Sequence, residues 1–236
     1  AGSTTKVTGL TSMTFGFASG SLTVADDVAM SAGIGKVGEL VDHADVNQPT
    51  HTNNPKLDFD DGSGLQASTS MGDMTLTGTY LWDGAHGNDI DGGTSTGAGL
   101  SLSMPVGAGS LTVGTAQTDT ASDDRNDTGA AFTMPLASGS LSVGYSQVTS
   151  DTAANDGEAY SVAYSTTVAG ASVALGYTAY EAAGNDSSRT EAVISSALGG
   201  GASLFFEFSN LTGDGVAAAG QDTDEGGFAI GTSVSF

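Results

Sequence analysis

Apolar and small polar residues alternate along most of this chain with a period of two. In the segment 129–136, the bulky side chains of Phe132, Met134 and Leu136 are separated by small residues or proline. The segments 140–149 and 172–181 show the same alternation. Successive side chains of a β-strand point to opposite faces, so this period is typical of strands with one apolar and one polar face. No segment shows the spacing of an amphipathic helix, and we expect an all-β protein.

Thirteen segments follow this pattern. We expect strands at 5–17, 21–26, 64–70, 74–82, 96–104, 110–118, 129–136, 140–149, 158–168, 172–181, 191–198, 203–210 and 227–236. Short turns of small residues alternate with long polar loops, which are expected at 26–63, 83–95, 119–128, 150–157, 182–190 and 211–226. This order predicts consecutive antiparallel hairpins in a meander.

A short repeat supports a single domain over residues 1–236. The sequence Ser-Leu-Thr-Val-Gly at 110–114 returns as Ser-Leu-Ser-Val-Gly at 140–144, with looser copies at 172–176 and 203–207. A turn of small residues precedes each copy. Self-similarity at a fixed spacing indicates equivalent structural units, here hairpins.

The charge is strongly acidic and unevenly distributed. Five Lys and Arg residues stand against 27 Asp and Glu residues, a formal net charge of −22. All the acidic residues except Asp73 and Glu207 fall in or beside the long loops. One end of the structure is therefore expected to be long and acidic, the other short and nearly uncharged, as in outer-membrane barrels. The lack of a basic patch excludes nucleic acid as a partner.

Alternation alone fits both a soluble sandwich and a membrane barrel. The polar face consists almost entirely of Ser, Thr, Gly and Ala, without the charges expected on the wet strands of a soluble acidic protein. Aromatic residues gather near both strand ends, as in interfacial girdles: Tyr80, Trp82, Tyr177 and Tyr180 toward the loops, and Phe15, Phe17 and Phe236 toward the turns. No run of about 20 apolar residues could form a transmembrane helix. We therefore predict an antiparallel up-and-down transmembrane β-barrel in a bacterial outer membrane, in contact with lipid and lipopolysaccharide.

The first hairpin resembles a known family. Thr-Phe-Gly-Phe at 14–17 and Gly-Ser-Leu-Thr-Val at 20–24, followed by a long acidic loop, are similar to the general porins of alphaproteobacteria. The resemblance implies a sixteen-stranded homotrimeric pore of Gram-negative bacteria that passes small hydrophilic solutes. Thirteen strands here would mean an N-terminal truncation, an incompletely built chain or a smaller barrel. The scarcity of Lys and Arg leaves open whether the transverse field of the family's constriction exists.

The loop 26–63 is the expected constriction. Loops this long are uncommon and usually functional, and its first half carries apolar residues that need a packing surface. We expect it to fold into the barrel, where carboxylates facing a narrow passage would attract cations. The expected pore-lining residues are Glu39, Asp42, Asp45, Asp58, Asp60 and Asp61, with Lys36 and Lys56 on the opposing side. Alternatively, the loop covers the rim or contacts a neighbouring subunit. Glu207 shares a strand face with Ser203 and Phe205, and is expected to face the lumen.

Two acidic loops offer oxygen ligands of the kind that Ca²⁺ prefers. The residues concerned are Asp123, Asp124, Asp127, Asp222, Asp224 and Glu225. Neither loop fits the EF-hand pattern, so a solvated acidic surface is favoured and weak Ca²⁺ binding is the alternative. The chain has no cysteine, which excludes disulfides and thiolate metal sites.

No catalytic constellation is visible. All three histidines lie in expected loops, and no nucleophile motif or glycine-rich phosphate loop accompanies them. We expect no enzyme activity and no cofactor other than Ca²⁺. The expected function is passive diffusion of small hydrophilic solutes and ions, with a preference for cations. The alternative is a secreted or surface-exposed acidic β-rich structural protein or adhesin.

Overall fold

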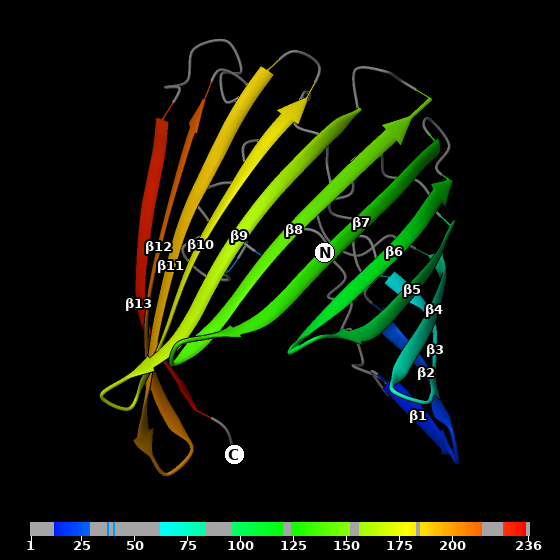
Figure 1. Ribbon diagram of the computed structural model, residues 1–236, viewed down its shortest axis with the longest axis horizontal. Coiled ribbons are helices and arrows are strands. Elements are labelled where there is room, and N and C mark those ends of the chain that lie inside the picture. Colours follow the sequence, from blue (N-terminus) through cyan, green and yellow to red (C-terminus); the bar gives the residue numbers. More distant parts are fainter. Residues whose placement is uncertain are drawn as a thin grey trace, which may run out of the picture.

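The computed structural model is a single antiparallel sheet of thirteen strands in sequence order (Figure 1). It describes residues 12–28, 37, 40, 62–83, 96–119, 124–151, 156–182, 185–213 and 224–234. The strands are β1 (Ser12–Phe17), β2 (Gly20–Val28), β3 (Gly62–Met71), β4 (Met74–Asp83), β5 (Thr96–Val106), β6 (Gly109–Asp119), β7 (Asp124–Leu136), β8 (Gly139–Ser150), β9 (Gly157–Val168), β10 (Ala171–Ala182), β11 (Asn185–Gly199), β12 (Ala202–Gly213) and β13 (Asp224–Val234). Every described strand pairs with its neighbours in the chain, so the up-and-down meander and the thirteen expected strands are confirmed over the described residues. Residues 5–11 of the first expected strand lie outside them.

The sheet curls around a common axis like the wall of a barrel (Figure 1). Within the described part of the chain, β1 and β13 each pair on one side only. No helix among the described residues is long and apolar enough to cross a membrane.

Short turns of two residues join alternate pairs of strands at one end of the sheet. In several of these turns the first residue is left-handed, including Gly107 with φ of 61° and Ala137 with φ of 53°. Such a conformation suits the tight turns that match the twist of an antiparallel hairpin. The other connections join strand ends at the opposite end of the sheet, as the sequence predicts, but the one expected at 182–190 is only two residues, 183–184, between β10 and β11.

The two faces of the sheet differ as the alternation predicts. The convex side, here called the outer face, carries large exposed side chains such as Phe15, Leu100, Val143 and Leu175, and Leu175 is 54% exposed. The register places these residues on the same face as their cross-strand partners, for example Val143 opposite Phe132 and Val162. No second sheet covers them among the described residues, so the sandwich interpretation is wrong. An uncovered apolar face on a β-barrel is the surface that contacts lipid.

Several strands extend further toward the long loops than expected. β7 begins at Asp124 rather than at 129, and β11 begins at Asn185 rather than at 191. β2 likewise continues to Val28, so residues 26–28 belong to a strand and not to the loop. The extensions of β7 and β11 carry polar residues at positions of both faces, so they lack the apolar alternation that marks the rest of each strand. They bring Arg125, Asp127 and Arg189 into the sheet.

Candidate functional site

The concave side of the sheet, here called the inner face, is lined mainly by small hydroxyl side chains. Neighbouring strands join these hydroxyls by hydrogen bonds, as between Thr133 and Ser142 at 2.8 Å and between Thr14 and Thr23 at 2.9 Å. Thr112 donates a longer hydrogen bond of 3.2 Å to Ser103. Such short polar side chains do not fill the interior of a large barrel, and their hydroxyls suit contact with water.

Near the long loops the inner face changes character. One apolar inward residue lies close to the loop end of each even-numbered strand from β4 to β12, and all are at most 5% exposed: Leu81, Ala116, Val148, Tyr180 and Leu211. Tyr180 packs with Val148 and Ala159. Its assignment to the outer aromatic girdle was therefore wrong, because its position on β10 has the opposite parity to exposed Tyr177. The loop end is therefore the most deeply buried part of the described inner face.

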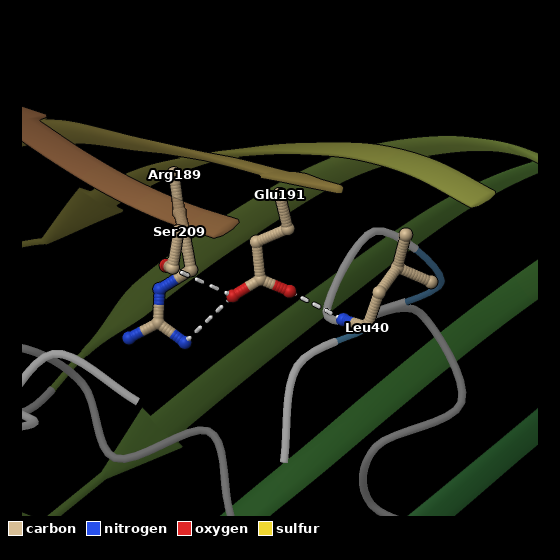
Figure 2. Close-up of polar contacts among 4 residues, drawn as sticks. All are labelled: Leu40, Arg189, Glu191 and Ser209. Carbon is tan, nitrogen blue, oxygen red and sulfur yellow. Dashed lines mark hydrogen bonds and ion pairs between the residues drawn. The ribbon is translucent and has the colours of Figure 1, made fainter. Parts of the chain in front are cut away.

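Glu191 on β11 is a buried charged residue of this inner face with contacts to three other residues. Its side chain is only 2% exposed. One carboxylate oxygen, Oε1, accepts a hydrogen bond from Ser209 Oγ on β12 at 3.3 Å and lies 3.6 Å from the guanidinium of Arg189. The other oxygen, Oε2, accepts a hydrogen bond from the backbone N–H of Leu40 (Figure 2). The carboxylate therefore joins two wall strands to a residue far away in the sequence.

Leu40 belongs to the connection between β2 and β3, 151 residues before Glu191. β11 lies far around the sheet from β2 and β3, on the opposite side of the curved wall (Figure 1). A connection that stayed at the rim above its own strands could not reach the inner face of β11. Leu40 therefore lies on the concave side of the sheet.

A second pair repeats the arrangement of Arg189 and Glu191. On β7, Arg125 and Asp127 are two residues apart on the inner face, and Asp127 is fully buried. In both strands the arginine lies nearer the long loops and the carboxylate lies deeper. Alternation alone places both members of each pair on one face. Among the inner-face side chains that the structure describes, two arginines thus stand against three carboxylates, the third being Glu207.

Glu207 is 5% exposed and lies on the inner face of β12 together with Ser209. Its chain neighbour Phe208 is on the outer face and 38% exposed. The register pairs Glu207 with Val193 on β11 and Ala229 on β13. The structure thus brings Glu207 onto the same wall as Glu191 and Arg189.

For most of the other expected site residues, the structure describes either only the backbone or nothing. Lys36, Glu39, Asp42, Asp45, Lys56, Asp58, Asp60, Asp61, Asp123 and Asp222 lie outside the described residues. Asp224 and Glu225 begin β13, where only their backbone is described. Asp124 and Asp127 occupy opposite faces of β7, so the strand does not bring their carboxylates together. Within the described ranges, no group of three or more His, Cys, Asp or Glu residues could hold a metal ion.

Sequence reasoning missed the functional position of Arg189 and Asp127, because their segments were assigned to loops. It placed Glu191 at the first residue of an expected strand but did not recognise that its side chain faces inward. A signal was nevertheless present. Ile194 faces outward on β11. Residues 191 and 189 lie an odd number of positions before it, so the alternation of a strand places their side chains on the inner face. The contact with Leu40 had no local signal.

Comparison with known proteins agrees with this architecture. The chain resembles an anion-selective porin from Comamonas acidovorans, with 16% identity over 92% of this chain and 74% of that one, and a TM-score of 0.67. It also resembles OmpF of Salmonella typhi in a complex with daunomycin, with 11% identity over 90% and 74% of the two chains and a TM-score of 0.65. For OmpT of Vibrio cholerae, an outer-membrane protein, the identity is 14% over 91% and 76%, with a TM-score of 0.61.

At these identities the solved structures establish the fold alone. No curated protein sequence matches the chain. The family model for Gram-negative porins matches residues 7–216, which is most of the sequence. The protein therefore belongs to the Gram-negative porins and is a β-barrel protein of the bacterial outer membrane.

Proposed function

We propose that the chain forms a water-filled pore through which small hydrophilic solutes and ions diffuse passively, without catalysis. The observation that carries this proposal is the division of one sheet into two faces. The outer face exposes side chains such as Val143 and Leu175 that suit acyl chains, and the inner face presents hydroxyls such as those of Thr133 and Ser142. Only a closed barrel in lipid makes both faces favourable at once.

The connection between β2 and β3 is proposed to narrow this pore. The hydrogen bond from Leu40 to Glu191 supports a path across the inside of the barrel. Glu39, Asp42, Asp45, Asp58, Asp60 and Asp61 would then face the passage, with Lys36 and Lys56 opposite them. Carboxylates in a narrow, partly desolvated passage raise the local concentration of cations. Among the side chains that the structure describes on the inner face, two arginines stand against three carboxylates, which adds no positive excess, and the pore is proposed to prefer cations.

Planar-bilayer recordings test both parts of the proposal. Purified protein should give discrete conductance steps, and a KCl gradient should give a reversal potential of the sign expected for K⁺ selectivity. Replacing Asp58, Asp60 and Asp61 together by Asn should shift the reversal potential toward zero. Asp73→Asn, in the short turn between β3 and β4, is the matched control and should leave it unchanged. Lack of conductance steps would defeat the pore, and anion selectivity would defeat the charge assignment alone.

The assembly is proposed to be a homotrimer embedded in lipid and lipopolysaccharide. One of the similar structures is a trimer form of OmpT from Vibrio cholerae. An oligomer that resists SDS until it is heated, with the mass of three chains, would support the trimer. Within the porin family, the hairpin 14–24 and its acidic loop favour the alphaproteobacterial type, whose sixteen-stranded barrel is the expected closed form.

Weak Ca²⁺ binding by the acidic loops is a separate proposal. It rests on the carboxylates of residues 119–127 and 214–225, which suit a hard cation. Calorimetric titration of the folded protein with CaCl₂ should show saturable heat that an Asp222→Asn/Asp224→Asn variant loses. A titration without saturation would leave a solvated acidic surface instead.

A further inference from the structure

We infer that Phe205 is a stacking platform for neutral sugars on the turn-side half of the inner face, and that pyranose saccharides are among the solutes that the pore takes up. This inference rests on the proposed pore function and names a substrate class for it. The platform belongs to the wall itself. Phe205 is the fourth residue of β12, which places it about 8 Å from the turn end at a rise of about 3.4 Å per residue and a tilt of about 40°.

Aromatic side chains are rare on the inner face. Among the residues that the structure describes, the register places only Tyr180 and Phe205 there. Tyr180 is 5% exposed and packs with Val148 and Ala159, so its ring offers little surface to a solute. Phe205 is half-buried and lies in the part of the wall that carries mainly Ser, Thr, Gly and Ala. Its ring is therefore the aromatic surface that a solute meets on the described wall.

The cross-strand neighbours of Phe205 are small. The register places Ser195 of β11 on one side of it and Gly231 of β13 on the other. The far edge of the ring lies over Gly231, where an added Cβ would come within 2.3 Å of the ring atom Cζ. The side chain therefore lies along the wall and does not extend across the lumen. A ring in this position can present its face to a passing solute without blocking the passage.

Serine hydroxyls border the ring. Ser195 is directly opposite Phe205, and Ser203 is two residues before it on the same face. Ser203 is in turn opposite Ser233 of β13. A hydroxyl group both donates and accepts hydrogen bonds, as do the hydroxyl groups of a sugar. The C–H face of a pyranose packs on the electron-rich face of an aromatic ring, so an aromatic surface bordered by hydroxyls matches both sides of a sugar.

The charge near the ring favours a neutral solute over an organic cation. Glu207, two residues after Phe205 on the same face, is only 5% exposed, and its carboxylate offers little surface for direct contact with a cation. The arginines of the described inner face, Arg125 and Arg189, lie toward the long loops, away from Phe205. An apolar aromatic solute would make no use of the serine hydroxyls. A neutral saccharide uses both the ring and its border.

Planar-bilayer recordings with maltotriose test the platform. In the parent pore, maltotriose at millimolar concentration should lower the conductance in a saturable way. Phe205→Ala and Phe205→Leu should raise the half-saturating concentration several-fold, and Phe205→Tyr should stay close to the parent because it keeps the ring. Phe206→Ala is the matched control and should leave the response unchanged, because Phe206 pairs with outward Ile194 and Ile230 and faces lipid.

The leucine variant separates stacking from bulk. Leucine keeps an apolar side chain beside Gly231 but has no aromatic face, so a leucine variant that responds like the parent would overturn the platform. Choline in place of maltotriose tests the class of solute. A block by choline that depends on Phe205, without one by maltotriose, would overturn the assignment to sugars in favour of an organic cation.

A binding measurement distinguishes the platform from the pore itself. Saturation-transfer NMR on the folded barrel in detergent detects weak maltotriose binding without conduction, and the signal should fall several-fold in Phe205→Leu but not in Phe206→Ala. A barrel that conducts but shows neither transfer nor block would overturn the platform and leave the pore function intact. Transfer that depends on Phe205 in a barrel that never conducts would overturn the pore function and leave a saccharide site.

Discussion

Placing one arginine on either face of β8 tests the orientation of the whole barrel. Val143 and Ser142 are adjacent on this strand, and Val143 faces outward with 43% of its surface exposed. The twelve residues of β8, at a rise of about 3.4 Å and a tilt of about 40°, cross roughly 30 Å, somewhat more than the apolar band of about 25 Å. By the same geometry Val143, four residues into the strand, lies about 10 Å from the turn end and inside that band.

The expected costs differ because the two side chains meet different solvents. An arginine on the lipid face near mid-depth costs about 2–4 kcal/mol, and we expect Val143→Arg to reduce the free energy of unfolding by about that much. Ser142 faces inward, where an arginine can remain hydrated. Ser142→Arg loses the 2.8 Å hydrogen bond with Thr133, which contributes about 1 kcal/mol. The outward variant should therefore be less stable by about 1–3 kcal/mol, the difference between these two costs.

Equilibrium unfolding in lipid vesicles measures this difference. The chain has a single tryptophan, Trp82, which lies on the outer face with 43% exposure and reports its transfer from lipid to denaturant. Val143→Leu is the control, because it keeps an apolar side chain at the same place and should unfold like the parent. If Val143→Arg were as stable as the parent and Ser142→Arg were the damaged variant, Val143 would face water and the assignment of the two faces would be refuted.

Two further predictions use the same unfolding measurement. Gly139→Ala should reduce stability by about 1–3 kcal/mol, because a Cβ there would overlap the Ser165 carbonyl oxygen and come within 2.7 Å of the Tyr164 ring. Gly16→Ala, with nothing within 4 Å of its Cβ, should have little effect, and equal behaviour of the two would contradict the packing at the turn end. Tyr180→Ala should cost about 3 kcal/mol, since Tyr180 is buried with Val148 and Ala159. Tyr177→Ala, at an outer position 44% exposed, should cost clearly less, and the reverse order would return Tyr180 to the lipid face.

Local pattern determined most of the fold from the sequence alone. Side chains of a strand alternate between two faces whatever the rest of the chain does, so the positions of Val143, Leu175 and Glu207 on their faces follow from counting residues. The short turns of small residues indicated which strand ends lie at one end of the sheet, and the acidic loops indicated which lie at the other. The strand bounds at Asp124 and Asn185 could not be read in this way, because beyond the lipid both faces are polar and alternation disappears.

Only the tertiary structure decided what meets inside the barrel. Glu191 and Leu40 are 151 residues apart, and no periodicity along the chain relates them. Their contact depends on the curvature of the sheet, which brings β11 opposite β2 and β3, and on the path of one connection across the interior. Curvature and closure are properties of all the strands together. The sequence by itself therefore determined the order of the strands and the face on which each side chain of the wall lies. The arrangement of charged residues within the passage depends on the three-dimensional structure.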